Sequence, residues 1–305
     1  MNKLTIKACP LCGGTHLERA LTCVDHYASG EMFHLCRCRD CGFLFTQDFP
    51  VEAEIGRYYE TPDYISHTDT RKGAMNSVYH WVRNYMLGRK ARLVVREAHR
   101  KEGRLLDLGT GTGYFADAMQ RRGWQVEAVE KSAQARAFAK EHFNLDVKPH
   151  TALKDFAPGS FDVITLWHVM EHLEPLNETW ETLHSLLTEK GVLIVAVPNC
   201  SSFDAKKYGA YWAAYDVPRH LWHFTPAPSS NSVPSMASSW QSGIPCRSML
   251  LRLHADRKAH EALVYFPAGN GDRYTGLVQR VGEEGTQQFH DLRVQEERVR
   301  KGIRD

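Results

Sequence analysis

The residue types best suited to chemistry lie in one glycine-rich stretch, residues 104–116, which reads RLLDLGTGTGYFA. A short apolar run opens the stretch, glycines follow at alternate positions, and a helical pattern begins after the last of them. Glycine lets a backbone approach a ligand closely or adopt positive φ without a Cβ clash. A strand, a glycine turn and a helix in this order begin a nucleotide-binding α/β unit. The candidate cofactor-binding residues are Asp107, Gly109, Thr110, Gly111 and Gly113.

A carboxylate follows at the end of the next predicted strand, residues 125–130. Glu130 can accept hydrogen bonds from both hydroxyls of a bound ribose, as the acidic residue of dinucleotide-binding folds does. The alternative is an exposed glutamate at a strand end. Because Glu130 follows the glycine loop, we favour ribose binding, and the GxGxG spacing differs from the GxGxxG of dinucleotide enzymes.

Two CxxCG motifs near the start of the chain have the spacing of zinc knuckles, CPLCG at 9–13 and CRDCG at 38–42. Two such pairs complete a tetrahedral four-thiolate site with no open position, which makes the predicted zinc ion structural. The predicted ligands are Cys9, Cys12, Cys38 and Cys41, in a zinc ribbon over residues 1–50 with β-hairpins between the two pairs. The alternatives are four unrelated buried thiols, or Cys36 as a ligand in place of Cys38.

The other cysteine and the histidines of this segment are interpreted as structural. We expect Cys23 to be a core thiol, and His16, His26 and His34 to be packing or surface residues. A segment this short hardly buries a sufficient core alone, so the metal is expected to supply its stability.

A histidine-containing segment follows a predicted buried strand at residues 161–173, FDVITLWHVMEHL. Its candidate catalytic residues are His168, Glu171 and His172, whose i, i+3, i+4 spacing lets them share one helical side. His172 has a structural alternative, a hydrogen bond to the backbone that fixes the loop.

A second segment, DVPRHLWHFT at 216–225, is rich in groups that stack or hydrogen-bond. His220 is the fourth candidate catalytic residue. Arg219 and His223 are candidates for acceptor binding or proton removal, and the competing interpretation of the segment is a structural clamp.

The glycine loop resembles the S-adenosylmethionine (SAM) site of class I methyltransferases, and HVMEHL and DVPRHLWHFT resemble segments of the ubiquinone-biosynthesis type. The resemblance implies methyl transfer from SAM. It implies that the glycine loop holds the methionine portion, Glu130 the ribose, and Asp107 the loop amides or the SAM amino group. By the same resemblance, Asp155 contacts adenine.

In some of these O-methyltransferases, carboxylates and a histidine of the EHL segment hold a divalent cation against the acceptor oxygen. Here His168 stands where an acidic residue is frequent, which leaves a general base as the alternative. The resemblance also makes certain residues of the segment before the first helix candidates for a lid, and an aromatic staple is the other interpretation. These residues are Tyr58, Tyr59, Tyr64 and His67.

Strands and helices alternate over 104–225, which predicts an α/β protein with a doubly wound, mostly parallel sheet behind the zinc-ribbon module. Strands are expected at 104–109, 125–130, 145–147, 161–166 and 192–197, with a helix from Pro175 to Gly191. Apolar residues at helical spacing predict a leading helix from residue 75. The methyltransferase domain is placed at 51–225.

The pattern fails at residues 226–305, where a class I methyltransferase needs two more strands. Two interpretations remain: an unusual lid or disordered tail, or a departure from the ancestral reading frame near residue 227, which we favour. Translation of the encoding DNA in the other frames tests this hypothesis.

Composition limits the class of partner. The 38 basic and 36 acidic residues give a net charge of +2, too even to indicate nucleic-acid binding by bulk charge. No apolar run has the length of a membrane span and no signal peptide is evident, so a cytoplasmic location is expected. We expect O-methylation of a small-molecule or sugar-linked acceptor. The alternatives are C-methylation of a nucleotide-linked sugar, an RNA base methyltransferase, and an inactive SAM-binding or interaction protein.

Overall fold

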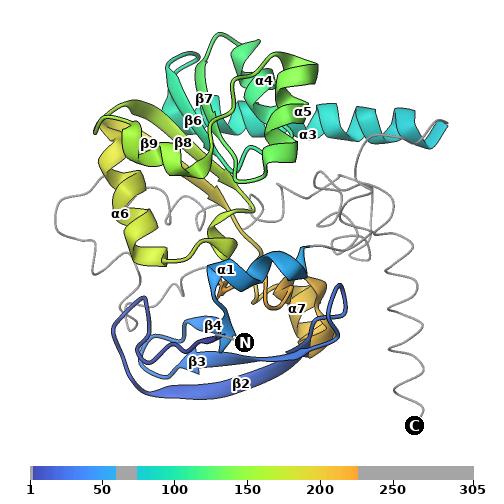
Figure 1. Ribbon diagram of the computed structural model, residues 1–305. Helices are drawn as coiled ribbons and strands as arrows, with labels where there is room; N and C mark the ends of the chain where they lie inside the picture. Colours follow the sequence, from blue (N-terminus) through green and yellow to red (C-terminus); the bar gives the residue numbers. More distant parts are fainter. Residues whose placement is uncertain (1–2, 60–73, 226–305) are drawn as a thin grey trace.

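The computed structural model describes residues 3–59 and 74–225 of the chain (Figure 1). The lid candidates Tyr64 and His67, and the interpretations given for residues 226–305, lie outside the described residues.

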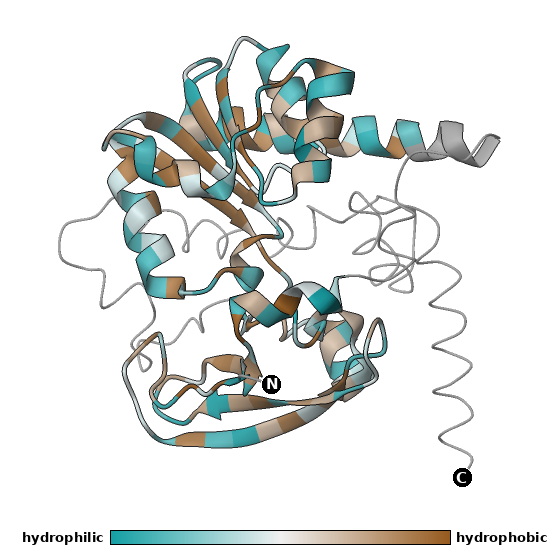
Figure 2. Cartoon of the chain, in the orientation of Figure 1, coloured by the Kyte–Doolittle hydropathy of each residue, from teal (hydrophilic) through white to brown (hydrophobic). Residues whose placement is uncertain are grey.

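A four-stranded parallel sheet carries the glycine loop. Its order is β7-β6-β8-β9, with bounds Gln125–Val129, Arg104–Leu108, Phe161–Trp167 and Leu187–Ala196. Apolar side chains alternate between two covered faces, so β8 is buried along almost its whole length. Figure 2 shows how apolar residues gather in these strands. The predicted doubly wound, mostly parallel sheet is confirmed.

Helices cover both faces of this sheet. On one face, α3 (Ala74–Ala98) and α4 (Tyr114–Gln120) pack through Val94, Phe115 and Met119. On the other, α6 (Leu176–Leu186) presents Leu183 and Leu186 to β6, β8 and β9. Beside β7, α5 (Ala133–Phe143) packs its buried Ala139.

One expected strand is absent and one expected boundary between a helix and a strand is misplaced. Residues 145–147 form no strand: Lys148 alone makes an isolated bridge to Val129, between Asn144, where the chain turns at φ +53°, and the 3-10 helix η2, which begins at His150. The helix that begins after Pro175 ends at Leu186, and β9 starts at Leu187 rather than beyond Gly191. Gly191 lies inside the strand.

The N-terminal module, residues 3–50, holds a hairpin of β2 (Leu17–Val24) and β3 (Met32–Cys38). Next to β3 lies β4 (Leu44–Gln47), and β1 (Lys3–Leu4) pairs with β5 (Phe49–Pro50). The remaining elements are short: α1 (Glu52–Ile55), η1 (Gly56–Tyr58), η2 (His150–Asp155), η3 (Met170–His172), α7 (Phe203–Tyr208), η4 (Gly209–Tyr211) and η5 (Ala213–Tyr215).

The outer strand of the module's sheet comes from the far end of the described chain. This strand, β10 (Trp222–His223), pairs antiparallel with β4, so the sheet order is β10-β4-β3-β2. Trp222 lies opposite Phe45 and donates from its indole to the carbonyl of Leu173 at 2.7 Å. One apolar cluster runs from the module through Trp222 to α6 and the parallel sheet. The module and the parallel sheet therefore share a core.

His223 is buried in the seam between β10 and β4. The Thr46 hydroxyl donates to the carbonyl of His220 at 2.6 Å, so it accepts from Nε2–H of His223 at 3.0 Å. Burial, and then the charge of His220, lower the pKa of His223 to about 3.

We expect neutral His223, buried between β10 and β4, to contribute less to the free energy of unfolding in acid. Because the folded pKa lies below the ordinary 6.5, the unfolded chain binds the extra proton, and stability falls as the pH drops from 6.5 toward 3. In His223→Gln, whose amide can still donate to Thr46, the free energy of unfolding should fall less steeply, by up to about 1.4 kcal/mol per pH unit. Urea unfolding at several pH values measures this, and parallel curves for the two proteins would contradict it.

Candidate active site

The glycine loop turns at the carboxyl end of β6 with the backbone of its glycines at positive φ, +70° at Gly109, +57° at Gly111 and +86° at Gly113. Only glycine adopts these values without strain. A Cβ on Gly109 would also collide with the side chain of Val169, which follows β8. The amides of Gly109 and Thr110 donate to the carbonyl of Val129, at 2.8 and 3.1 Å, and tie the loop to the end of β7.

Glu130 lies beside this loop, as its place after β7 predicts. One carboxylate oxygen accepts from the amide of Gly111 at 2.9 Å, and the other accepts from the amide of Ser132 at 2.8 Å. Two backbone donors on one carboxylate fix its orientation. Each oxygen keeps a further lone pair that can accept a hydrogen bond from a ligand. The glycine loop and Glu130 therefore form one pre-arranged unit.

Asp107 and Asp155 differ in their surroundings. Asp107 is buried within β6, and its Oδ1 accepts from the hydroxyl of Thr165 on β8 at 2.7 Å. A contact with a loop amide was expected of Asp107, and it is Glu130 that accepts from the amide of Gly111. Asp155 is exposed at the end of η2.

His168 leaves the end of β8 in a strained conformation, with φ +60°, which is uncommon for a residue with a Cβ. Its side chain is 49% exposed, and its Nδ1 lies 3.5 Å from Oε1 of the fully buried Glu171. Burial alone would raise the pKa of the Glu171 carboxyl, but the contact with His168 and the charge of His220 lower it on balance. A buried carboxylate is thus set behind a half-exposed imidazole.

Two more imidazoles complete what we call the histidine group, which consists of His168, Glu171, His172 and His220. The rings of His172 and His220 contact edge to face, with centroids 4.5 Å apart. Nδ1 of His172 donates to the carbonyl of Arg219 at 3.0 Å, and Nδ1 of His220 donates to the carbonyl of Ala214 at 2.9 Å. These carbonyls can only accept, so each ring carries a proton on Nδ1.

The Glu171 carboxylate at the centre of the group is fully buried. Glu171, His172 and His220 place a carboxylate oxygen and two ring nitrogens within 4.8 Å of one another. Neither oxygen of the Glu171 carboxylate has a hydrogen-bond partner among the described residues. Burial, followed by the charge of His220, lowers the pKa of His172 to about 4, so this ring stays neutral near pH 7.

The lid candidates that the structure describes have separate positions. The hydroxyl of Tyr59 lies 3.2 Å from Nδ1 of His172 and thus contacts the histidine group. Tyr58 is fully buried and donates to Glu31 of the N-terminal module at 2.9 Å.

Arg219 and His223 are buried and face the N-terminal module. They are held by Asp25, Thr46 and Asp216. Asp25 and Thr46 lie far away along the chain, so no local pattern pointed to them, whereas Asp216 is three residues before Arg219. An aspartate just after a predicted hairpin strand, at position 25, is the one signal available, and it is common in turns.

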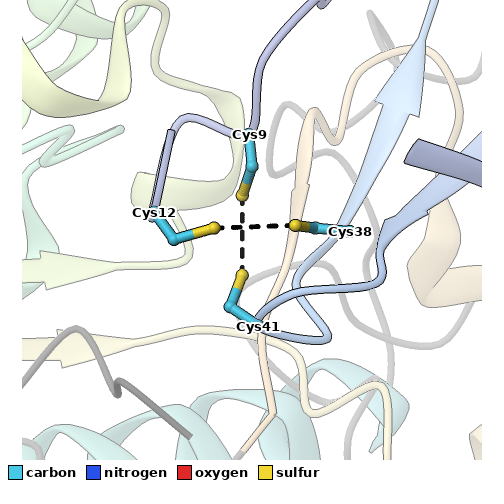
Figure 3. A group of neighbouring side chains, drawn as sticks. All are labelled: Cys9, Cys12, Cys38 and Cys41. Atoms are coloured by element: carbon cyan, nitrogen blue, oxygen red, sulfur yellow. Dashed lines mark hydrogen bonds between the residues drawn. The ribbon is translucent and has the colours of Figure 1, made fainter. Parts of the chain in front are cut away.

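The four predicted zinc ligands converge on one point (Figure 3). The Sγ atoms of Cys9 and Cys41 lie 3.6 Å apart, as do those of Cys12 and Cys38. A tetrahedral zinc site with Zn–S bonds of about 2.3 Å separates its sulfurs by about 3.8 Å, so the donor set fits. Cys36 is not in this group.

Comparison with known proteins agrees with this geometry. A family described as "Methyltransferase domain" matches residues 79–229. A ubiquinone biosynthesis O-methyltransferase of Caulobacter sp. (strain K31) is 33% identical over 130 residues, which cover 39% of this chain and 52% of that protein. Residues 79–229 form a class I, SAM-dependent methyltransferase domain.

Other relatives of this domain are more varied. An uncharacterized methyltransferase of Staphylococcus carnosus is 30% identical over 35% of this chain and 51% of its own. A solved structure of a SAM-dependent methyltransferase from Archaeoglobus fulgidus is 22% identical, with a TM-score of 0.38, over 46% of this chain and 63% of its own. The methyltransferase domain spans about half the length of the curated relatives it matches. Among the described helices, none is both long and apolar enough to cross a membrane.

Proposed function

We propose that this protein transfers the methyl group of SAM to a hydroxyl of a small-molecule or sugar-linked acceptor. The observation that carries the proposal is the pairing of half-exposed His168 with the buried carboxylate of Glu171, next to the glycine loop. Val169 packs against Gly109, so the histidine segment and the cofactor loop meet at one edge of the sheet.

The cofactor half of the site suits SAM. The ribose hydroxyls would donate to Glu130, and the positive-φ glycines leave room for the methionine portion against the backbone. Asp107 is proposed to act from within β6 by fixing the loop, and Asp155 to flank the adenine.

The acceptor half suits a hydroxyl. Glu171 would hold Nδ1–H of His168, which leaves Nε2 to accept the proton of the acceptor. The acceptor oxygen then forms its bond to the methyl carbon as the carbon–sulfur bond breaks, and S-adenosylhomocysteine and a methyl ether result. Most of the rate enhancement would come from alignment of the two reactants. His172 and His220 would orient Glu171 and the acceptor.

The role of Glu130 is tested by binding. Glu130→Gln keeps the shape of the side chain but removes its charge, and hydrogen bonds to a charged group contribute about 1.5–3 kcal/mol. We expect the affinity for SAM, measured by calorimetry, to fall about 10- to 100-fold. Glu127→Gln is the control, because Glu127 lies on the same strand and pairs with Lys148 instead. Equal affinity in both variants would exclude the proposed ribose contact.

The proposed base is tested by transfer of labelled methyl from SAM into the low-mass fraction of a nuclease-treated cell extract. We expect His168→Ala to slow transfer by about 10²- to 10⁴-fold at saturating SAM, with SAM affinity unchanged. His150→Ala, an exposed histidine on η2, should transfer at the wild-type rate. Methyl transfer that occurs only in extract not treated with nuclease would point to RNA as the acceptor. An undiminished rate in His168→Ala would exclude His168 as the base.

We also propose that Cys9, Cys12, Cys38 and Cys41 bind one structural zinc ion. The support is the pairwise separation of their sulfurs and the positive φ of Gly13 and Gly42, which follow each pair. A four-thiolate site has no open position, so the ion would stabilise the module and take no part in methyl transfer.

Zinc content distinguishes the two candidate ligands on β3. Elemental analysis should find about one zinc per chain in the wild type and in Cys36→Ser, and little in Cys38→Ser, because only Cys38 points into the thiol group. Loss of zinc from Cys36→Ser with retention in Cys38→Ser would reverse the assignment.

A further inference from the structure

A short segment, Arg219–His223, carries His220 and contacts both the N-terminal module and the rest of the histidine group. On the catalytic side, the amide of Leu221 donates to the carbonyl of Glu171 at 2.7 Å, and the carbonyl of Arg219 accepts from His172. On the module side, the amide of Thr46 donates to the carbonyl of Leu221 at 2.9 Å. The position of His220 is therefore set from two directions.

The side chain of Arg219 fastens this segment to the module. It is 3% exposed, and it donates to Asp25 of the β2–β3 turn at 3.0 Å and to Asp216 at 2.6 Å. A third donor group reaches the carbonyl of Tyr58 at 2.8 Å, directly before the tyrosine that contacts His172. The ring of Tyr27 lies under the guanidinium, 5.0 Å away.

Burial of the Arg219 guanidinium contributes little net stability by itself. A buried guanidinium loses its hydration, and its pairing with carboxylates in most cases only offsets that loss. Arginine, however, holds several acceptors in one fixed plane, which makes it suited to fix geometry. Its acceptors here come from the module, the segment before α3 and the turn that precedes His220.

We propose that Arg219 is a positioning residue through which the N-terminal module holds the His172 and His220 rings in place. Asp25 is the module's contribution to this contact. The inference rests on the proposed role of the histidine group, but it concerns the geometry of the rings and is tested without an acceptor.

The test compares Asp25→Asn with Ser29→Ala in the full chain. The asparagine can still accept from the amides of Tyr27 and Ala28 through its oxygen, but it no longer offers a charge to Arg219, and its NH2 group replaces the oxygen that accepts from Ser29. Ser29→Ala is the matched control: it removes another hydrogen bond to the same carboxylate, from the Ser29 hydroxyl, and leaves the contact with Arg219. Ring ¹⁵N NMR reports the tautomer of His172, and hydrogen exchange reports the Leu221 amide.

We expect His172 to show one tautomer, Nδ1–H, in the wild type and in Ser29→Ala, and a mixture in Asp25→Asn. Exchange of the Leu221 amide should be at least about 10-fold faster in Asp25→Asn, with SAM affinity and zinc content unchanged. A folded Asp25→Asn with the wild-type tautomer and exchange rate would overturn the proposal. Weak SAM binding in all three proteins would instead count against the proposed function.

Arg219→Lys provides a second variant, since lysine keeps the charge but cannot reach three groups of acceptors in one plane. The same mixture of tautomers is expected. If neither this variant nor Asp25→Asn folds, the contact is a general stabiliser of the chain and the positioning role is rejected.

Discussion

The buried Arg219 guanidinium is the interaction on which the arrangement of the site depends. It joins Asp25, near the start of the chain, to Asp216 and to the backbone of Tyr58. Pairing of β10 with β4 runs alongside it and extends the module's sheet with residues from the far end of the described chain. Together these contacts make the N-terminal module part of the same folded unit as the parallel sheet, with one apolar cluster between them. The module's proposed zinc ion would then support the histidine group at a distance, by stabilising the surface against which Arg219 is fixed.

The two halves of the proposed active site rest on different physical devices. The cofactor half is local: a turn of glycines at positive φ, tied by hydrogen bonds to the carboxyl end of β7 and to Glu130. The acceptor half is assembled from distant segments and relies on burial, with the Glu171 carboxylate enclosed by three imidazoles. The glycine loop should therefore keep its geometry when other parts of the chain change, whereas the histidine group should lose its geometry when any of its contributing segments moves. We therefore expect lesions in the N-terminal module to affect the histidine group before they affect the cofactor loop.

Local patterns in the sequence were sufficient for the parallel sheet, the glycine loop, the place of Glu130 and the convergence of the four cysteines. Each of these depends on spacing within one element or on a motif with its own geometry. The strand expected at 145–147 is absent because the turn at Asn144 and the start of η2 at His150 limit the ladder to a single bridge, and an apolar pattern does not show either of these. The contacts of Arg219 with Asp25 and Tyr58, and the pairing of Trp222 with Phe45, join residues that are far apart in sequence. Such contacts depend on the packing of the whole chain, so no window of residues predicts them.

The most direct test of the account is a crystal structure of the full chain with SAM bound. The account predicts that both ribose hydroxyls contact Glu130, that the methionine portion lies along the backbone of Gly109 and Gly111, and that the sulfonium methyl points toward His168 and Glu171. A complex in which the methyl group points away from these two side chains, or in which Glu130 has no contact with the ribose, would contradict it.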